Sequence, residues 1–78
     1  MPPRPLSSRE VLRTLAHEGF IFISQRGSHA KYRKSKHGET VTVIVPTRKR
    51  EIPTGTVRSI IRQSHLPKEI FFDNTHGV

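Results

Sequence analysis

The chain has 78 residues, enough for one small domain with a modest core. It contains no cysteine, which excludes disulfides and thiolate metal sites, and no apolar run of membrane-spanning length or secretory leader, so a cytoplasmic setting is expected. Fourteen Lys and Arg against six Asp and Glu give a formal net charge of +8, which favours a nucleic acid or an acidic protein as the partner.

A first helix is expected to begin after Ser7. The Ser7 hydroxyl can cap it, and Glu10, three residues on, can complete a capping box. Gly19 ends the helix. The apolar residues of one helical face recur at the expected spacing and are Val11, Leu12, Leu15 and Ala16.

Three strands of an antiparallel meander are expected next. Their residues are rich in β-branched and aromatic types and span 20–26, 29–34 and 40–45. Gly27-Ser28 predicts a two-residue hairpin turn, because glycine supplies the positive φ that such a turn needs. Residues 36–39 predict the second turn, and Pro46 ends the third strand because proline cannot donate to a ladder.

A basic loop over residues 47–51 leads to a second helix, and Leu66-Pro67 ends it. The buried stripe expected on that helix is Val57, Ile60, Ile61 and Ser64. A short helical turn after Pro67 is expected to bury Ile70 with Phe71 or Phe72. We expect a single domain over 1–78, with an ordered core over about 6–72 and flexible tails at 1–5 and 73–78.

The order predicts an α+β fold: a three-stranded antiparallel sheet with both helices on one face and the other face open. A two-residue turn at Gly27-Ser28 pairs Arg26 with His29 and sorts the side chains by alternation. The side chains expected to face the helices are Ile21, Ile23, Ala30 and Tyr32. Those expected on the other face are Phe22, Ser24, Arg26, His29, Lys31 and Arg33.

A basic sheet face is typical of phosphate binding, which positions a strand without reading its sequence, although a merely solvated charged face is the alternative. The candidate phosphate contacts are Arg26, Lys31, Arg33, Lys34, Arg48, Lys49 and Arg50. Phe22 is a candidate platform for stacking an unpaired base, or else a contact for a protein partner.

His29 is the candidate catalytic residue, because an imidazole can take and give a proton near neutral pH. When the 2′-hydroxyl of RNA attacks the neighbouring phosphate, a base must take the hydroxyl proton and an acid must protonate the leaving oxygen. Cations around the phosphate are also needed. The alternative is a histidine that only hydrogen-bonds RNA or the turn. The carboxylates are scattered and the other histidines lack ligand spacing, so neither a metal nor a cofactor is expected. His37, in the next turn, is the only plausible second proton carrier, although a histidine that merely lies on the surface is the favoured interpretation.

Two motifs in this order resemble the HicA toxins: Arg26-Gly27-Ser28-His29 after the first strand, and residues 51–63, which open the second helix. The resemblance runs from about Ser8 to Ile70. It implies a fold like that of double-stranded-RNA-binding domains, metal-independent cleavage of mRNA, and a HicB antitoxin that covers the active site. The family's essential histidine falls on His29 and its preceding glycine on Gly27, so that Gly27 and Ser28 join the expected RNA contacts.

One departure from that family lies after the third strand. Many relatives have a histidine there, where this chain has residues 47–50, Thr-Arg-Lys-Arg, which can bind phosphate but cannot shuttle protons at neutral pH. Two other functions stay open from the sequence: a non-catalytic nucleic-acid-binding module of the same fold, and an interaction protein whose basic face meets only an acidic partner.

Overall fold

The computed structural model describes residues 4–73, so most of the two tails expected to be flexible, residues 1–3 and 74–78, lies outside the described residues. Helix α1 spans Ser8–His17. Its capping box forms as expected: the backbone N–H of Glu10 donates to the Ser7 hydroxyl at 3.1 Å, and the Ser7 N–H donates to the Glu10 carboxylate at 3.0 Å.

The buried face of α1 differs from the expected one: Leu12 is only partly buried, and Ser8 is buried in addition. Val11 and Leu15 are buried as expected. Thr14 is also buried, whereas Ala16, which was expected on the buried face, is exposed. Residues three apart lie on one helical face, so Thr14 shares the face of Val11.

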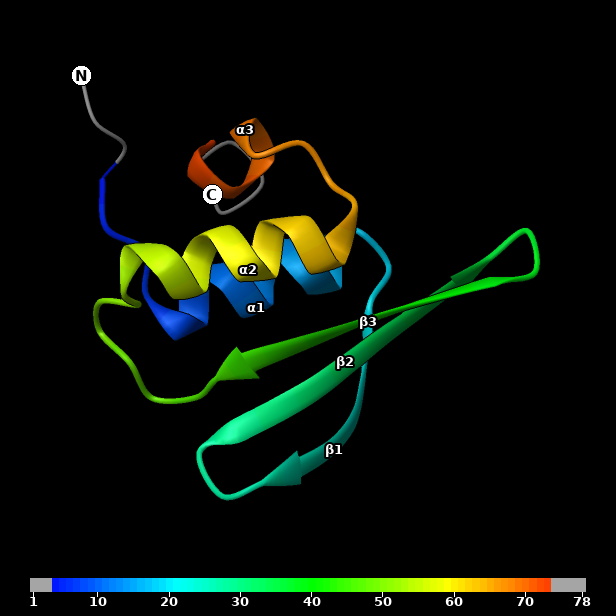
Figure 1. Cartoon of the computed structure of the whole chain (residues 1–78), viewed down its shortest axis with the longest axis horizontal. Helices are drawn as coiled ribbons and strands as arrows, with labels where there is room; N and C mark the ends of the chain where they lie inside the picture. Colours follow the sequence, from blue (N-terminus) through cyan, green and yellow to red (C-terminus); the bar gives the residue numbers. More distant parts are fainter. Residues whose placement is uncertain (1–3, 74–78) are drawn as a thin grey trace.

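The sheet is the predicted meander, in the order β1-β2-β3, with both pairs antiparallel (Figure 1). The strands are β1 Ile21–Arg26, β2 His29–Lys36 and β3 Glu39–Pro46. Gly27 has φ +56°, the single positive φ that a turn with glycine in first place requires. The second hairpin turns at His37 and Gly38, both with positive φ, so β2 and β3 pair as far as Lys36 and Glu39.

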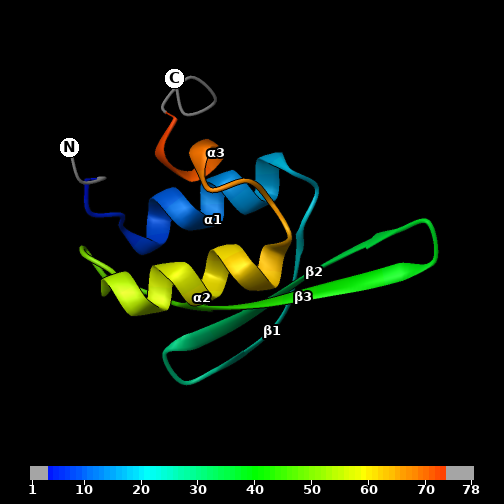
Figure 2. The same ribbon diagram turned by 45° about the horizontal axis from the view of Figure 1, so that its top comes forward.

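Helix α2 spans Thr54–Ser64 and the short helix α3 spans Glu69–Phe72. Both long helices lie on one side of the sheet, over β3, as the α+β prediction required (Figures 1 and 2). The core is made by α1, α2, α3, β3 and residues that flank them: Leu6, Val11, Leu15, Phe20, Val43, Val45, Ile52, Val57, Ile60 and Phe71. The helices leave β1 uncovered, and every residue of β1 is exposed.

A β-bulge corrects the predicted register of β1. From the turn, Arg26 pairs with His29, Gln25 with Ala30 and Ser24 with Lys31, as expected. Between Phe22 and Ser24 the register shifts, so that Phe22 pairs with Tyr32 and Ile21 with Arg33. One extra residue in a strand reverses the alternation beyond it.

The bulge therefore overturns three predicted orientations. Ile21 lies beside Arg33 on the open face and is 63% exposed, although it was expected to face the helices. Phe22 shares the face of Tyr32, with the two rings edge-to-face at 5.8 Å, although it was expected on the open face. Ile23 is the extra residue and is exposed instead of facing the helices.

Candidate nucleic-acid interface

The open face of the sheet is defined by the residues of β2 that point away from the core. Ala30 is buried and pairs with buried Val45, so the alternate residues His29, Lys31 and Arg33 point to the opposite side. Their neighbours on β1 and β3 complete this open face: Ile21, Ser24, Arg26, Thr42 and Ile44. The face therefore carries one imidazole and three cations, in rows set by the strand pairing.

His29 stands at one end of this face and is exposed. It pairs with Arg26 across the hairpin, and Lys31 lies two residues further along the same strand. Together with Ser24, Ala30 and Ile44, these three residues line a shallow depression of about 520 Å³. The structure thus confirms the prediction that one surface carries Arg26, His29 and Lys31.

The Ser28 hydroxyl lies 3.4 Å from Nδ1 of His29. When Nδ1 carries the proton, it can donate to the hydroxyl oxygen, which leaves Nε2 as the unprotonated ring nitrogen that can take a proton. The partner of one ring nitrogen thus sets the state of the other. Gly27, one residue earlier, has open space where a Cβ would stand, so its requirement is the positive φ of the turn.

Lys34 departs from the other predicted phosphate contacts. By alternation it faces the helix side of β2, and its Nζ lies 5.8 Å from the centroid of the Phe20 ring, which is buried in the core. Its aliphatic stem runs beside Gly19, where a Cβ would lie 3.5 Å from the Lys34 Cε. Arg33, by contrast, stays on the open face, where its Nε donates to the Thr42 hydroxyl at 3.4 Å.

The basic loop after β3 starts beside the turn that carries His29. The backbone N–H and the hydroxyl of Thr47 both donate to the carbonyl oxygen of Ser28, at 2.7 and 3.2 Å. Arg48, Lys49 and Arg50 follow and are exposed. The loop and the hairpin turn thus meet at the same end of the sheet, which brings the two predicted groups of cations together.

Ser8 holds the other side of this loop, and sequence reasoning missed it. Its hydroxyl is buried, donates to the carbonyl oxygen of Pro46 at 2.5 Å and accepts from the backbone N–H of Lys49 at 3.0 Å. The Ser8 backbone N–H donates to the Lys49 carbonyl at 2.8 Å. The local sequence marks Ser7 as the helix cap, and nothing in it distinguishes the long-range role of the next serine.

His37 is not placed to assist His29. The two histidines lie at opposite ends of β2, whose eight residues extend over about 23 Å. The structure therefore agrees with the favoured interpretation of His37 as a surface histidine. The carboxylates are also dispersed: within residues 4–73, no three His, Asp or Glu side chains gather as metal ligands do.

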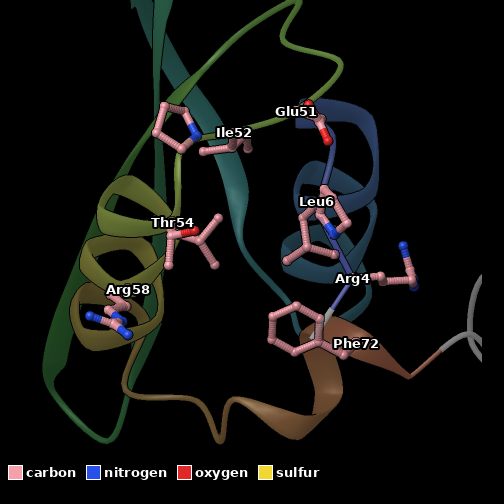
Figure 3. Close-up of a pocket in the computed structure, with 10 residues that line it drawn as sticks. Arg4, Leu6, Glu51, Ile52, Thr54, Arg58 and Phe72 are labelled. Atoms are coloured by element: carbon pink, nitrogen blue, oxygen red, sulfur yellow. The ribbon is translucent and has the colours of Figure 1, made fainter. Parts of the chain in front are cut away.

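A second hollow, of about 590 Å³, lies on the helix side of the molecule (Figure 3). Leu6, Ile52 and Phe72 line it from three different segments, with Arg58 of α2 at its edge. None of the predicted site residues, all of which are described, lines this hollow. This hollow is therefore separate from the predicted site.

The fold and this surface define a small basic α+β domain of α-β-β-β-α order, closed by a short third helix. The model of the family described as "HicA toxin of bacterial toxin-antitoxin" matches residues 8–66, which is more than half of the chain. The chain belongs to the HicA toxin family, as its motifs indicated. It is the toxin component of a toxin–antitoxin pair, and an antitoxin is its partner.

A comparison with curated proteins finds no significant match. Among the described residues, no helix is both long enough and apolar enough to cross a membrane.

Proposed function

We propose that this toxin is a metal-independent endoribonuclease, an mRNA interferase, in which His29 is the general acid and base. The observation that carries the proposal is the position of His29, exposed in a depression between Arg26 and Lys31 on the open face. A proton carrier beside fixed cations is the combination that cleavage of a phosphodiester by a neighbouring hydroxyl requires.

In the proposed reaction, the RNA 2′-oxygen attacks phosphorus while the neutral His29 imidazole takes the 2′-hydroxyl proton. The bond between phosphorus and the 5′-oxygen then breaks, and the 5′-oxygen takes a proton from the imidazolium. The products are a 2′,3′-cyclic phosphate and a 5′-hydroxyl end. Arg26 and Lys31 stabilise the charge that builds up on the phosphoryl oxygens, and the open approach to His29 admits the RNA strand.

Further cations hold the strand on either side of the scissile phosphate. Arg33 continues the basic row along β2, and the loop with Arg48, Lys49 and Arg50 extends it past the hairpin turn. Gly27 and Ser28 contribute the tight turn and the hydroxyl at Nδ1. Lys34 has no part in this proposal, because it lies on the other side of the sheet.

We further propose that the antitoxin is a HicB-like protein that covers His29 and the open face. The net charge of +8 favours an acidic partner there. Covering His29 would keep RNA away from the one residue proposed to carry out the proton transfers.

The test is cleavage of a defined mRNA in excess chelator by the parent toxin and by His29→Ala, with RNA binding followed in parallel. We expect cleavage by the parent alone, with a loss of about 10²-fold or more in His29→Ala, and binding retained in both. The matched control is His37→Ala, which removes an exposed histidine from the far turn of the same strand pair and should cleave like the parent.

The main alternative function is a non-catalytic RNA-binding module on the same face. It predicts salt-dependent RNA binding by the parent and by His29→Ala, without a new RNA product from either. Equal cleavage by His29→Ala and the parent would remove His29 from the mechanism.

A further inference from the structure

The open face carries two large aliphatic side chains that the proposed chemistry does not use. Ile21 of β1 is 63% exposed and Ile44 of β3 is 37% exposed. Both stand directly beside a cation of β2, since Ile21 pairs with Arg33 and Ile44 lies opposite Lys31. An isolated exposed isoleucine is common, so what distinguishes this face is that its two isoleucines flank the same pair of cations.

The bulge in β1 is what brings Ile21 to this face. Without the register shift between Phe22 and Ser24, Ile21 would point to the helix side. Strands in a sheet lie about 4.8 Å apart and residues about 3.3 Å apart, so Ile21 and Ile44 stand about 12 Å from each other across Lys31 and Arg33. One protein segment can span that distance and contact both.

The chemistry of this surface distinguishes its ligands. RNA phosphates pair with Lys31 and Arg33, but an aliphatic isoleucine offers RNA neither a hydrogen bond nor a stacking surface. A protein segment with carboxylates between apolar side chains satisfies both kinds of residue. A second copy of this chain is disfavoured, because the cations of two open faces would repel each other.

We propose that Ile21 and Ile44 are the apolar anchors for an acidic segment of the antitoxin, and that RNA binding does not use Ile21. Carboxylates of that segment pair with Lys31 and Arg33. Because Ile44 lines the same depression as His29, a segment seated on Ile44 also covers His29. The proposal rests on one part of the proposed function, the antitoxin that covers this face.

The experiment measures the affinity of the purified toxin for the antitoxin encoded with it, by titration calorimetry, and for a short mRNA fragment. The variants are Ile21→Ser, Ile44→Ser and the double variant. Burial of an isoleucine side chain at an interface predicts an antitoxin Kd raised about tenfold by each single change and about a hundredfold by both. Ile21→Ser should bind and cleave RNA like the parent.

The control is Ala16→Ser, which makes an apolar-to-polar change at an exposed position of α1. It should leave both affinities unchanged. Thermal unfolding verifies that each variant is folded. Methyl NMR of the parent toxin supplies a second measurement that needs no substitution: the Ile21 and Ile44 signals should shift when the antitoxin is added.

Unchanged antitoxin affinity in the double variant, or unshifted Ile21 and Ile44 methyl signals, would overturn the proposal. So would an RNA affinity that falls in Ile21→Ser as much as the antitoxin affinity does. A dimer of the toxin alone that the same substitutions dissociate would assign the surface to self-association. If the parent fails to cleave RNA while the antitoxin still needs Ile21, the catalytic proposal fails and the anchors stand.

Discussion

The Ser28 carbonyl oxygen accepts two hydrogen bonds from Thr47, one from its backbone N–H at 2.7 Å and one from its hydroxyl at 3.2 Å. Ser28 immediately precedes His29, so this contact ties the basic loop to the residue proposed to be catalytic. The loop is in turn held by Ser8 at the start of α1. Helix, loop and hairpin turn therefore form one connected support beneath the proposed active site.

Replacing Thr47 with Val should reduce RNA cleavage while the fold stays intact. Valine keeps the branched shape and the backbone N–H, and removes only the hydroxyl that binds Ser28. One hydrogen bond contributes about 1 kcal/mol, so we expect a cleavage rate about fivefold lower, because the turn carrying His29 is held less firmly. Cleavage is measured under single-turnover conditions, with amide hydrogen exchange of residues 27–29 as the structural readout.

Thr47→Ser is the matched control, since it restores the hydroxyl and should restore both the rate and the exchange protection. Equal rates for Val and Ser at position 47 would show that the hydroxyl does not position the turn.

Replacing Ser8 with Ala should destabilise the whole domain. The change leaves the buried Pro46 carbonyl and the partly buried Lys49 N–H without their hydrogen-bond partner. Unpaired buried groups cost about 1–3 kcal/mol, so the free energy of unfolding should fall by about 2 kcal/mol. Urea denaturation measures it, with Ser35→Ala at an exposed position of β2 as the control, expected within about 0.5 kcal/mol of the parent. A similar stability for both variants would contradict the role of Ser8.

Lys31 and Lys34 should behave differently when each is replaced with Gln. Lys31 lies on the open face, so its loss should weaken RNA binding and reduce the slope of log K against log salt by about 0.7, the release of one counterion from a single strand. Lys34 lies over the Phe20 ring on the helix side, so its loss should leave the slope unchanged. Filter binding at several salt concentrations measures both. A slope that falls equally in the two variants would mean that RNA also reaches the helix side of β2.

The capping box of α1 should make the stability of the domain depend on pH in the acid range. Partial burial acts to raise the pKa of Glu10, but hydrogen bonds from the Ser7 backbone N–H and from Arg4, with the Arg4 charge, outweigh it and hold the pKa below 4.5. The pKa of Glu10 is thus lower in the folded state than in the unfolded state. The stabilisation is therefore present above about pH 4.5 and is lost as the pH falls through the folded-state pKa.

Replacing Glu10 with Gln should therefore lower stability by about 0.5 kcal/mol at neutral pH, the usual contribution of a charge in the first turn of a helix. As the pH falls through the lowered pKa of Glu10, the variant and the parent should converge. Thermal unfolding across pH 3–7 measures the difference. A difference that stays constant through the acid range would show that the carboxylate charge is not what stabilises the cap.

Local rules were sufficient for the elements of this fold. The capping box at Ser7, the hairpin turn at Gly27 and the apolar stripe of α2 each depend on residues a few positions apart, and all three are present. The pairing of Arg26 with His29 followed from the two-residue turn, because a turn of that length leaves one register. The sequence alone therefore places His29 among cations.

The sequence by itself determined the α-β-β-β-α order, the basic face and the position of His29 on it, because these depend on short-range periodicity and turn chemistry. Only the tertiary structure decided the bulge that exposes Ile21, the turning of Lys34 toward Phe20, and the bridge from Ser8 to the basic loop. A bulge reflects how the uncovered strand β1 fits its one neighbour. The Ser8 bridge joins residues 41 positions apart, and such contacts form only when packing brings the segments together.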